Sequence, residues 1–207
     1  MLRQAQHDVL LLIKIIHNTT VQPFSTARLY FRPFLDSDAA GKFALDSDPA
    51  VHRYLGGIGG RLVTEFSQSL AMIHFIQTQY TTNGIGRWAV LLRETDEFMG
   101  WAGLKLVAGP MNGHHNFYDL GYRYQPRYWG QGYGYEAAQA WFDYGFQTLQ
   151  LPRICAYADA NNAGSRRILT KIGLQQGNEF VEDGTRCVWY EADNLSQKLP
   201  QQAFSSV

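Results

Sequence analysis

The sequence predicts an α/β domain built on a mixed, mostly antiparallel sheet. Two observations predict this class. Strand-like segments at 87–94, 97–107 and 116–125 follow one another through short connections, which is typical of an antiparallel meander. A helical segment then separates 116–125 from a further strand at 153–159, and a crossover of that length makes two strands parallel. We therefore expect a sheet with one parallel step between these two strands.

The elements of the first half are predicted from local signals in chain order. Residues 27–34 alternate as in a strand, and capping-type residues open a helix at 36–46. A short helix at 49–55 ends at a glycine-rich loop. The next helix, 64–80, carries apolar residues at helical spacing, with Thr64 as its predicted N-cap.

The second half is predicted as helix, strand, helix and hairpin. From Gly134 the apolar residues fall on one helical face, and small residues within it allow close packing on a sheet. The members of that face are Ala138, Trp141, Phe142, Gly145, Phe146 and Leu149. After the strand at 153–159, a helix at 163–172 stops at a glycine. The last two strands pair around Asp183 and Gly184, which is a hairpin signal.

Composition and charge argue against several classes of protein. The chain has 207 residues, of which 45% are hydrophobic, so a globular domain is expected rather than disorder. Lys and Arg together number 18, as do Asp and Glu, and this balance argues against nucleic acid or an anionic membrane as partner. Cys155 and Cys187 have no metal-ligand spacing, so we expect free thiols, a reducing cytoplasm and no metal.

The N-terminal segment 1–25 is expected to lie outside the main domain. Residues 9–16 are apolar, but Lys14 interrupts the run, no cleavage site follows, and the run is too short to cross a bilayer. Its apolar residues share one helical face. We expect this face to pack on the domain or on a second copy, as in a homodimer. A mobile appended arm is the alternative.

The stretch RYWGQGYGYE, residues 127–136, places three glycines between a predicted strand and a predicted helix. Gly130, Gly132 and Gly134 remove side chains from a loop at which the unpaired N–H groups of the helix point. The helix dipole also favours negative charge there. The pattern predicts a phosphate cradle. A tight turn packed under Trp129 is the structural alternative.

Nucleotide loops of two common types do not fit this stretch. The dinucleotide fingerprint asks for Gly-x-Gly-x-x-Gly directly after a strand, whereas here the glycines alternate and 126–129 intervene. No Lys-Ser or Lys-Thr follows, so a Walker-type loop is also excluded. The remaining ligand with a pyrophosphate and a long tail is coenzyme A.

Three motifs in order resemble the GNAT superfamily of acyl-CoA N-acyltransferases, in particular its RimJ/RimL-like branch of ribosomal-protein N-terminal acetyltransferases. The pyrophosphate motif falls on 129–134, with Trp129 where Gln or Arg is usual. An Asn-x-x-Ser element falls on Asn162 to Ser165 and is followed by a helix ending in KIGL. The opening TARLYFRPF and DPAVHRYLGG also resemble this branch. The similarity covers about 26–191, which leaves 192–207 as a tail.

The resemblance implies a GNAT fold with helices on both faces of the sheet and acetyl-CoA as co-substrate. The strands 116–125 and 153–159 are expected to splay apart around the pantetheine arm. The residues implied to hold the cofactor are Tyr122, Tyr124, Trp129, Gly130, Gln131, Gly132, Tyr133, Gly134, Asn162 and Ser165. Asn162 is also expected to serve as a helix N-cap.

The expected chemistry is attack of a neutral amine on a thioester, helped by proximity and by proton transfer. Many GNAT enzymes carry a tyrosine as proton donor where this chain has Leu169, so Ser165 is the candidate acid, with a capping serine as the alternative. Asp119 is the candidate base, and a solvent-facing strand end is its alternative reading. His114 and His115, in the adjoining loop, are the next candidates for the base, with a flexible polar loop as their alternative explanation.

We therefore expect an acetyl-CoA-dependent N-acetyltransferase that acts on a primary amine, either a protein N-terminus or a small molecule. The sequence does not select the acceptor, although Tyr54, Phe75, Trp88 and Trp101 are predicted as core or cleft wall. Because the base and acid are not fixed by the motifs, a non-catalytic acyl-CoA-binding sensor or subunit with the same fold is the alternative.

Overall fold

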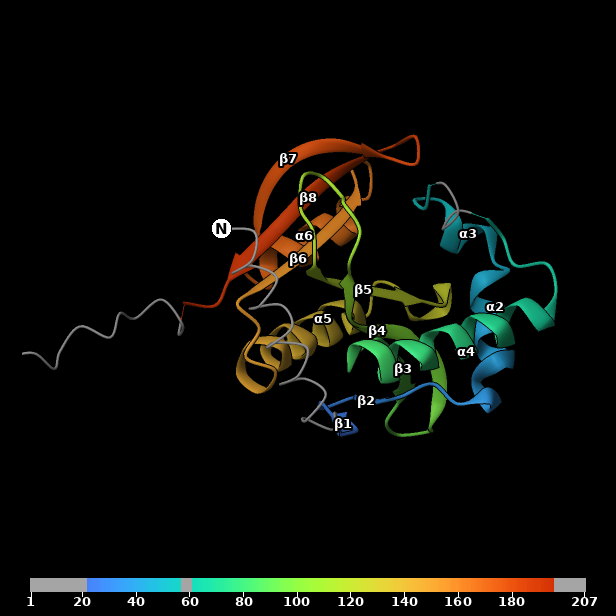
Figure 1. Cartoon of the computed structure of the whole chain (residues 1–207). Helices are drawn as coiled ribbons and strands as arrows, with labels where there is room; N and C mark the ends of the chain where they lie inside the picture. The colour runs from blue at the N-terminus through green and yellow to red at the C-terminus, as the bar shows by residue number, and fades with distance from the viewer. Residues whose placement is uncertain (1–21, 57–60, 196–207) are drawn as a thin grey trace, which may run out of the picture.

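The computed structural model describes residues 22–56 and 61–195, which fold around one eight-stranded sheet (Figure 1). The strand order is β1-β2-β3-β4-β5-β6-β8-β7. The strands are β1 (Phe24–Ser25), β2 (Leu29–Arg32), β3 (Arg87–Leu92), β4 (Glu97–Val107), β5 (Phe117–Tyr124), β6 (Arg153–Asp159), β7 (Gln175–Glu182) and β8 (Thr185–Asp193). Neighbours pair antiparallel except β5 and β6, which are parallel. The predicted fold class is confirmed.

Helices cover both faces of the sheet. They are η1 (Asp36–Asp38), α2 (Ala39–Asp46), α3 (Pro49–His52), α4 (Phe66–Asn83), η3 (Pro126–Tyr128), α5 (Tyr133–Asp143), η4 (Tyr144–Thr148) and α6 (Ala163–Lys171). The larger core, with Trp141 of α5 and Leu169 of α6, packs against Leu104 and Leu120 of the sheet. A second core, with Ile73 of α4, packs on Ala89 from the opposite face. This alternation follows from the two-residue period of the strands.

The parallel step lies where the sequence predicted it, and it is very short. The ladder between β5 and β6 contains one register pair, Asp119 with Cys155. Beyond that pair, β6 continues its ladder with β8 along its whole length. The two parallel strands therefore diverge beside Asp119, as the predicted splay requires.

Local signals located most elements to within a few residues, and the exceptions have side-chain causes. The third helix begins at Phe66 with Glu65 as N-cap, and not at Thr64. The Gln68 side chain accepts hydrogen bonds from the Thr64 and Glu65 N–H groups, at 2.9 and 3.2 Å, and so fixes where the helix starts. The helix ends at Gly84, whose φ of 70° is the left-handed C-cap conformation.

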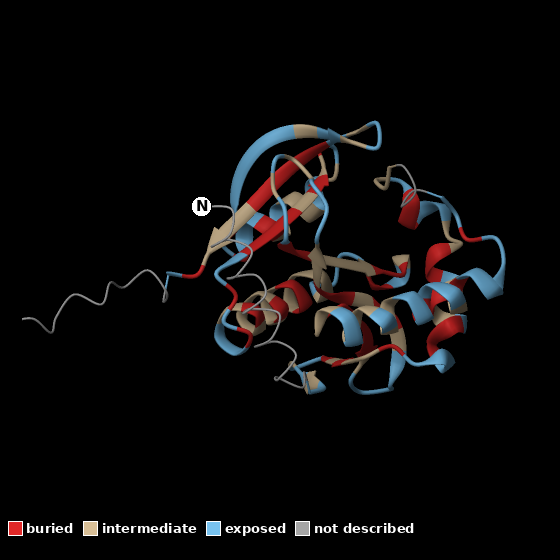
Figure 2. Ribbon diagram, viewed as in Figure 1, coloured by how far each residue is buried: buried red, intermediate tan, exposed pale blue. Residues whose placement is uncertain are grey.

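Burial follows the layers of the fold (Figure 2). The central strands are buried, whereas β7 at one edge of the sheet is exposed along most of its length. No helix among the described residues is long and apolar enough to cross a membrane. The predicted N-terminal helix at 9–16 lies outside the described residues, and the boundaries at 25 and 192 stay predictions.

Candidate active site

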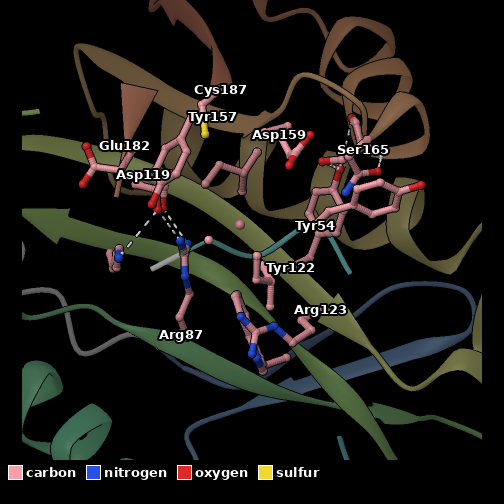
Figure 3. A pocket seen from close by; sticks show the side chains of 18 of the residues that line it. Tyr54, Arg87, Asp119, Tyr122, Arg123, Tyr157, Asp159, Ser165, Glu182 and Cys187 are labelled. Carbon is pink, nitrogen blue, oxygen red and sulfur yellow. Dashed lines mark hydrogen bonds and ion pairs between the residues drawn. The ribbon is translucent and has the colours of Figure 1, made fainter. Parts of the chain in front are cut away.

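A cavity of about 450 Å³ lies in front of the divergence between β5 and β6 (Figure 3). Strands β3, β4 and β5 form its floor, α2, α4 and the segment after α3 form one wall, and β6, α6 and the β7–β8 hairpin form the other. The two walls meet at one end, because a Cβ at Gly56 would lie 1.6 Å from the Thr185 hydroxyl oxygen. The cavity is therefore bounded by elements from most of the chain.

The glycine-rich loop follows β5 and leads into α5. Its three glycines are required for two different reasons. Gly130 and Gly132 have φ of 71° and 82°, in the left-handed region that favours glycine. A Cβ at either position would have no neighbour closer than 3.4 Å, so their conformation and not crowding requires glycine. Gly134 is a packing residue, because a Cβ there would lie 3.2 Å from Ile168 of α6. Trp129 fixes the start of the loop by donating from Nε1 to the Tyr124 carbonyl at 2.7 Å.

Backbone N–H groups gather at this loop without partners of their own. Among the described residues, the N–H groups of 130–135 donate no hydrogen bond, and the first helical bond of α5 runs from Glu136 N to Gly132 O. Gly132 is the N-cap and has no side chain to satisfy them. Such a row of free donors at the positive end of a helix dipole binds anions, phosphate above all.

The loop is tied to the N-terminal strands by a cluster that the sequence analysis missed. Glu136 accepts from the Thr26 hydroxyl at 2.6 Å and from the Arg28 Nε at 2.6 Å. Arg28 also donates from Nη1 to the Gln131 carbonyl and lies 4.3 Å from the centre of the Tyr133 ring. These partners are about a hundred residues apart in the chain, so no local pattern could have revealed them.

Burial alone would raise the pKa of Glu136, but the hydrogen bonds from Thr26 and Arg28 outweigh it and hold this pKa below its ordinary value. The carboxylate is therefore ionised at neutral pH. It neutralises Arg28 beside the loop and is occupied by these bonds.

Three of the predicted cofactor residues meet on the α6 side of the cavity. The Asn162 side chain accepts from the Ser165 N–H at 3.0 Å and caps α6, as expected. The Ser165 hydroxyl lies 3.1 Å from the Tyr122 hydroxyl, and all three residues line the cavity. Burial raises the pKa of Tyr122 to about 12, so its phenol stays protonated at neutral pH. Tyr124, in contrast, is buried in the core and is not among the lining residues.

Asp119 is buried and paired, which differs from the solvent-facing strand end considered above. The Arg87 side chain crosses the sheet from β3 and donates from Nη2 to the Asp119 Oδ2 at 2.5 Å (Figure 3). It also donates to the Gly103 carbonyl and, at 2.6 Å, to the Asp119 carbonyl. A Cβ at Gly121 would lie 2.6 Å from the Arg87 Nη2, so a glycine is needed under this arginine.

This ion pair bears directly on the predicted role of Asp119. The arginine occupies Oδ2, so an incoming amine could use only the other carboxylate oxygen. No described residue bonds to Oδ1, and Asp119 is among the residues that line the cavity. The assignment of Asp119 as base stays a prediction, and Arg87 is the residue that sequence reasoning missed.

The other candidates for the base lie away from the cavity. His114 stacks on Trp189 with ring centres 4.5 Å apart, and neither His114 nor His115 lines the cavity. Asn112 and Asn178 exchange side-chain hydrogen bonds at 3.1 and 2.9 Å, which hold this loop against β7. The structure thus places these histidines in a loop that packs on Trp189 of β8 and Phe117 of β5, outside the cavity lining.

The aromatic and thiol residues divide between core and cavity. Trp88 is core, whereas Tyr54, Phe75 and Trp101 line the cavity. Cys155 and Cys187 are free thiols, and burial raises their pKa to about 12 and about 11, so both are neutral. The described residues contain no group of side chains that could hold a metal ion.

Comparisons with known proteins give one consistent result. A family model described as acetyltransferase (GNAT) domain matches residues 28–175. The uncharacterized N-acetyltransferase YoaA of Bacillus subtilis (strain 168) is 32% identical over 73% of this chain and 81% of its own. A GNAT-family acetyltransferase from Bacillus anthracis has the same fold, with a TM-score of 0.68 at 23% identity over 84% of this chain and 99% of its own.

RimL, a ribosomal alpha-N-protein acetyltransferase solved in complex with coenzyme A, also shares the fold. Its TM-score is 0.68 at 13% identity, over 83% of this chain and 98% of its own. RimL belongs to the branch that the sequence motifs resemble. The sequence match and the fold match thus agree with the resemblance read from the motifs.

Proposed function

The chain belongs to the acetyltransferase (GNAT) family, and we propose that it moves an acetyl group from acetyl-CoA to a primary amine by direct attack in a ternary complex. The observation that carries this proposal is the row of free N–H groups at 130–135 beside the divergence of β5 and β6. The row suits a pyrophosphate, and the divergence suits a pantetheine arm. A thioester at the end of that arm would lie close to Asp119 and Ser165.

In the proposed reaction, the amine nitrogen attacks the carbonyl carbon of the thioester. The new C–N bond forms, the C–S bond breaks, and coenzyme A leaves as its thiol while the amine nitrogen loses a proton. An acceptor that arrives as an ammonium loses one further proton beforehand. The enzyme gains most of its rate by holding both reactants in contact, and proton transfer adds to this.

The hydroxyls of Ser165 and Tyr122 are the proposed source of the proton for the leaving sulfur. They are 3.1 Å apart, both line the cavity, and Tyr122 remains a neutral phenol because burial raises its pKa to about 12. A pair of bonded hydroxyls can pass a proton along, so that Ser165 donates and Tyr122 resupplies it. This pair would supply the proton that a tyrosine donates in many GNAT enzymes at the position of Leu169.

Asp119 is proposed to receive the amine at its open Oδ1, while Arg87 holds Oδ2 in place. A hydrogen bond from the ammonium to Oδ1 would orient the nitrogen and accept its proton, directly or through water. A rise in pH should help the reaction by supplying neutral amine.

The proposal is tested by a screen of primary amines with acetyl-CoA, in which the release of free thiol is followed. Amine-dependent release above the rate of hydrolysis is expected for at least one class of amine. If the protein binds acetyl-CoA but no amine releases thiol, the alternative of a non-catalytic acyl-CoA-binding subunit takes its place.

A further inference from the structure

The floor of the cavity carries more positive than negative charge. Two clusters of charged side chains lie on this floor and on the adjoining α2 wall, one on each side of Trp101. In the first, Arg87 and Lys105 lie 2.5 and 3.9 Å from the Asp119 carboxylate. In the second, Lys42 and Arg123 lie 2.5 and 2.9 Å from the Asp46 carboxylate. Four cations that line the cavity thus share two carboxylates among the described residues, and of these two acids only Asp119 lines the cavity.

This excess charge is poorly solvated. Lys42 is 2% exposed and Arg87 is 8% exposed. Burial lowers the pKa of Lys42, of Lys105 and of Arg87, and attraction to the carboxylates does not fully offset it. Positive charge that is held away from water without a matching acid is costly, and such sites are often completed by an anionic ligand.

Arg123 has the geometry to receive an anion. Its Nη1 donates to Asp46, while no described residue accepts from its Nε or Nη2. Its guanidinium carbon lies 5.2 Å from the centre of the Trp101 ring, and that of Arg87 lies 5.3 Å from the same ring. Two like charges on one indole repel each other, and a carboxylate between them would be bound by a fork of N–H donors.

The opposite wall of the cavity carries the opposite charge. Asp159 of β6 and Glu182 of β7 line it and lie across from Arg87 and Arg123 in Figure 3. Neither acid forms an ion pair with a cation of the floor in the described part of the chain. The cavity is therefore polarised, with cations on the β3–β5 floor and acids on the β6–β7 side. This arrangement is complementary to a molecule that carries both an ammonium and a carboxylate.

We propose that the acceptor is a primary amine that also bears a carboxylate, which Arg123 binds over Trp101 while the amine lies between Asp119 and the acids of the opposite wall. This inference rests on the proposed acetyl transfer and names its substrate class: amino acids with the two charges several atoms apart, or a peptide N-terminus followed by an acidic side chain. Tyr54 and Phe75 on the apolar wall would cover the carbon chain between the two charges. A carboxylate on the acyl group of the donor is the other source of the same chemistry.

The test uses matched acceptors that differ in the carboxylate alone. We would compare 4-aminobutyrate with butylamine, and peptides with Asp or Asn in second position, by thiol release from acetyl-CoA. For wild type, the KM of the carboxylate-bearing member of each pair should be lower by about ten- to hundredfold. This is the change in affinity that hydrogen bonds to a charged group usually produce. Arg123→Gln should reduce this preference to about twofold, and Arg123→Lys should retain part of it.

Control variants distinguish the loss of the carboxylate contact from a general loss of folding or of cofactor binding. Arg186→Gln removes an exposed arginine that pairs with Glu179 outside the cavity, and it should keep the full preference. Arg123→Gln should bind acetyl-CoA as tightly as wild type, because Arg123 is proposed to contact the acceptor and not the cofactor. Equal KM values within each pair for wild type, or a preference that survives Arg123→Gln, would overturn the proposal.

Two further experiments distinguish a failure of the carboxylate site from a failure of the proposed acetyl transfer. Calorimetric titration of 4-aminobutyrate and of butylamine into the protein loaded with coenzyme A measures binding without any reaction. If no amine releases thiol, tight binding of 4-aminobutyrate that Arg123→Gln abolishes still supports the carboxylate site, and equal binding of both ligands refutes it. If thiol is released faster from succinyl-CoA than from acetyl-CoA with butylamine, the carboxylate belongs to the donor and the acceptor class is wrong.

Discussion

The loop proposed to hold the cofactor and the acceptor side of the cavity are built in opposite ways. The loop presents mainly backbone, with consecutive N–H groups at 130–135 and glycines that set their direction, and none of these residues lines the cavity. The acceptor side is made of side chains, Arg87, Trp101, Asp119 and Arg123, that come from three different strands. A contiguous backbone site leaves a signature in a short stretch of sequence, whereas a site made of distant side chains does not.

The same difference predicts how each side tolerates substitution. A backbone site should be insensitive to the chemistry of most side chains and very sensitive to any change of backbone conformation. A side-chain site should fail when a single polar atom is exchanged, even if the fold is unchanged.

The largest effect is expected from Gly132→Val. Valine is strained at a φ of 82° and would change the direction of the free N–H groups, so acetyl-CoA affinity should fall by about a hundredfold, as when bonds to a charged group are lost. Calorimetric titration measures this. Gly113→Val is the matched control, because Gly113 has a φ of 76°, no crowding and a place in the loop before β5, next to Asn112, which bonds to Asn178 of β7. Equal affinity in Gly132→Val and Gly113→Val would refute the cradle.

Much of the fold was predictable because its signals are local. Strand β4 was predicted at 97–107 and is observed at Glu97–Val107, since alternation and a polar turn define it. The start of α4 was missed because a side chain, Gln68, decides it. The Arg28–Glu136 tether was missed because its two residues come together only in the folded chain.

The candidate site was predictable in part for the same reason. Asn162, Ser165 and Tyr122 were expected near the cofactor and line one cavity, since a motif and a neighbouring strand carry them. The ion pair of Asp119 with Arg87 was not predicted. The only local trace of it is Gly121 in the same strand, where a side chain would collide with Arg87. The path of the loop with His114 was not predictable, because only tertiary packing on Trp189 determines it.

The next largest effect is expected on the acceptor side, from Asp119→Asn. This change keeps the shape, removes the charge that faces the amine and leaves Arg87 without its acid. Turnover of the best amine should fall within the general-base range, about a hundredfold or more, while acetyl-CoA affinity hardly changes. Raising the pH should partly restore the rate because more amine is then neutral.

The exposed Asp36→Asn is a suitable control, since Asp36 does not line the cavity and pairs with His74 at the surface. Full activity of Asp119→Asn across the pH range would remove Asp119 from the mechanism.

A smaller effect is expected where the two sides meet, from Ser165→Ala and Tyr122→Phe. Each should slow acetyl transfer by about tenfold, which is below the usual range for proton-transfer catalysis, because a thiolate can also leave unaided. The deficit should shrink with acyl donors whose thiols are more acidic. Tyr124→Phe is the matched control on the same strand, because the Tyr124 hydroxyl is buried without a partner among the described residues and does not line the cavity. A deficit independent of the leaving thiol would indicate that the two hydroxyls only position the cofactor.

The smallest effect concerns the side-chain cluster around Glu136, which ties the glycine-rich loop to the N-terminal strands. Because the folded pKa of Glu136 is held below its ordinary value, the carboxylate stabilises the protein above the unfolded pKa of about 4.3, and this contribution disappears as the pH falls through the folded pKa. Glu136→Gln should therefore lower Tm by about 2–4 °C at pH 7, as expected for a loss near 1 kcal/mol in a domain of this size. The Tm values of the variant and wild type should converge in acid. If Glu136→Gln also weakened acetyl-CoA binding strongly, the loop would need its tether to hold the N–H groups in place, and the contrast between a backbone site and a side-chain site would be one of degree.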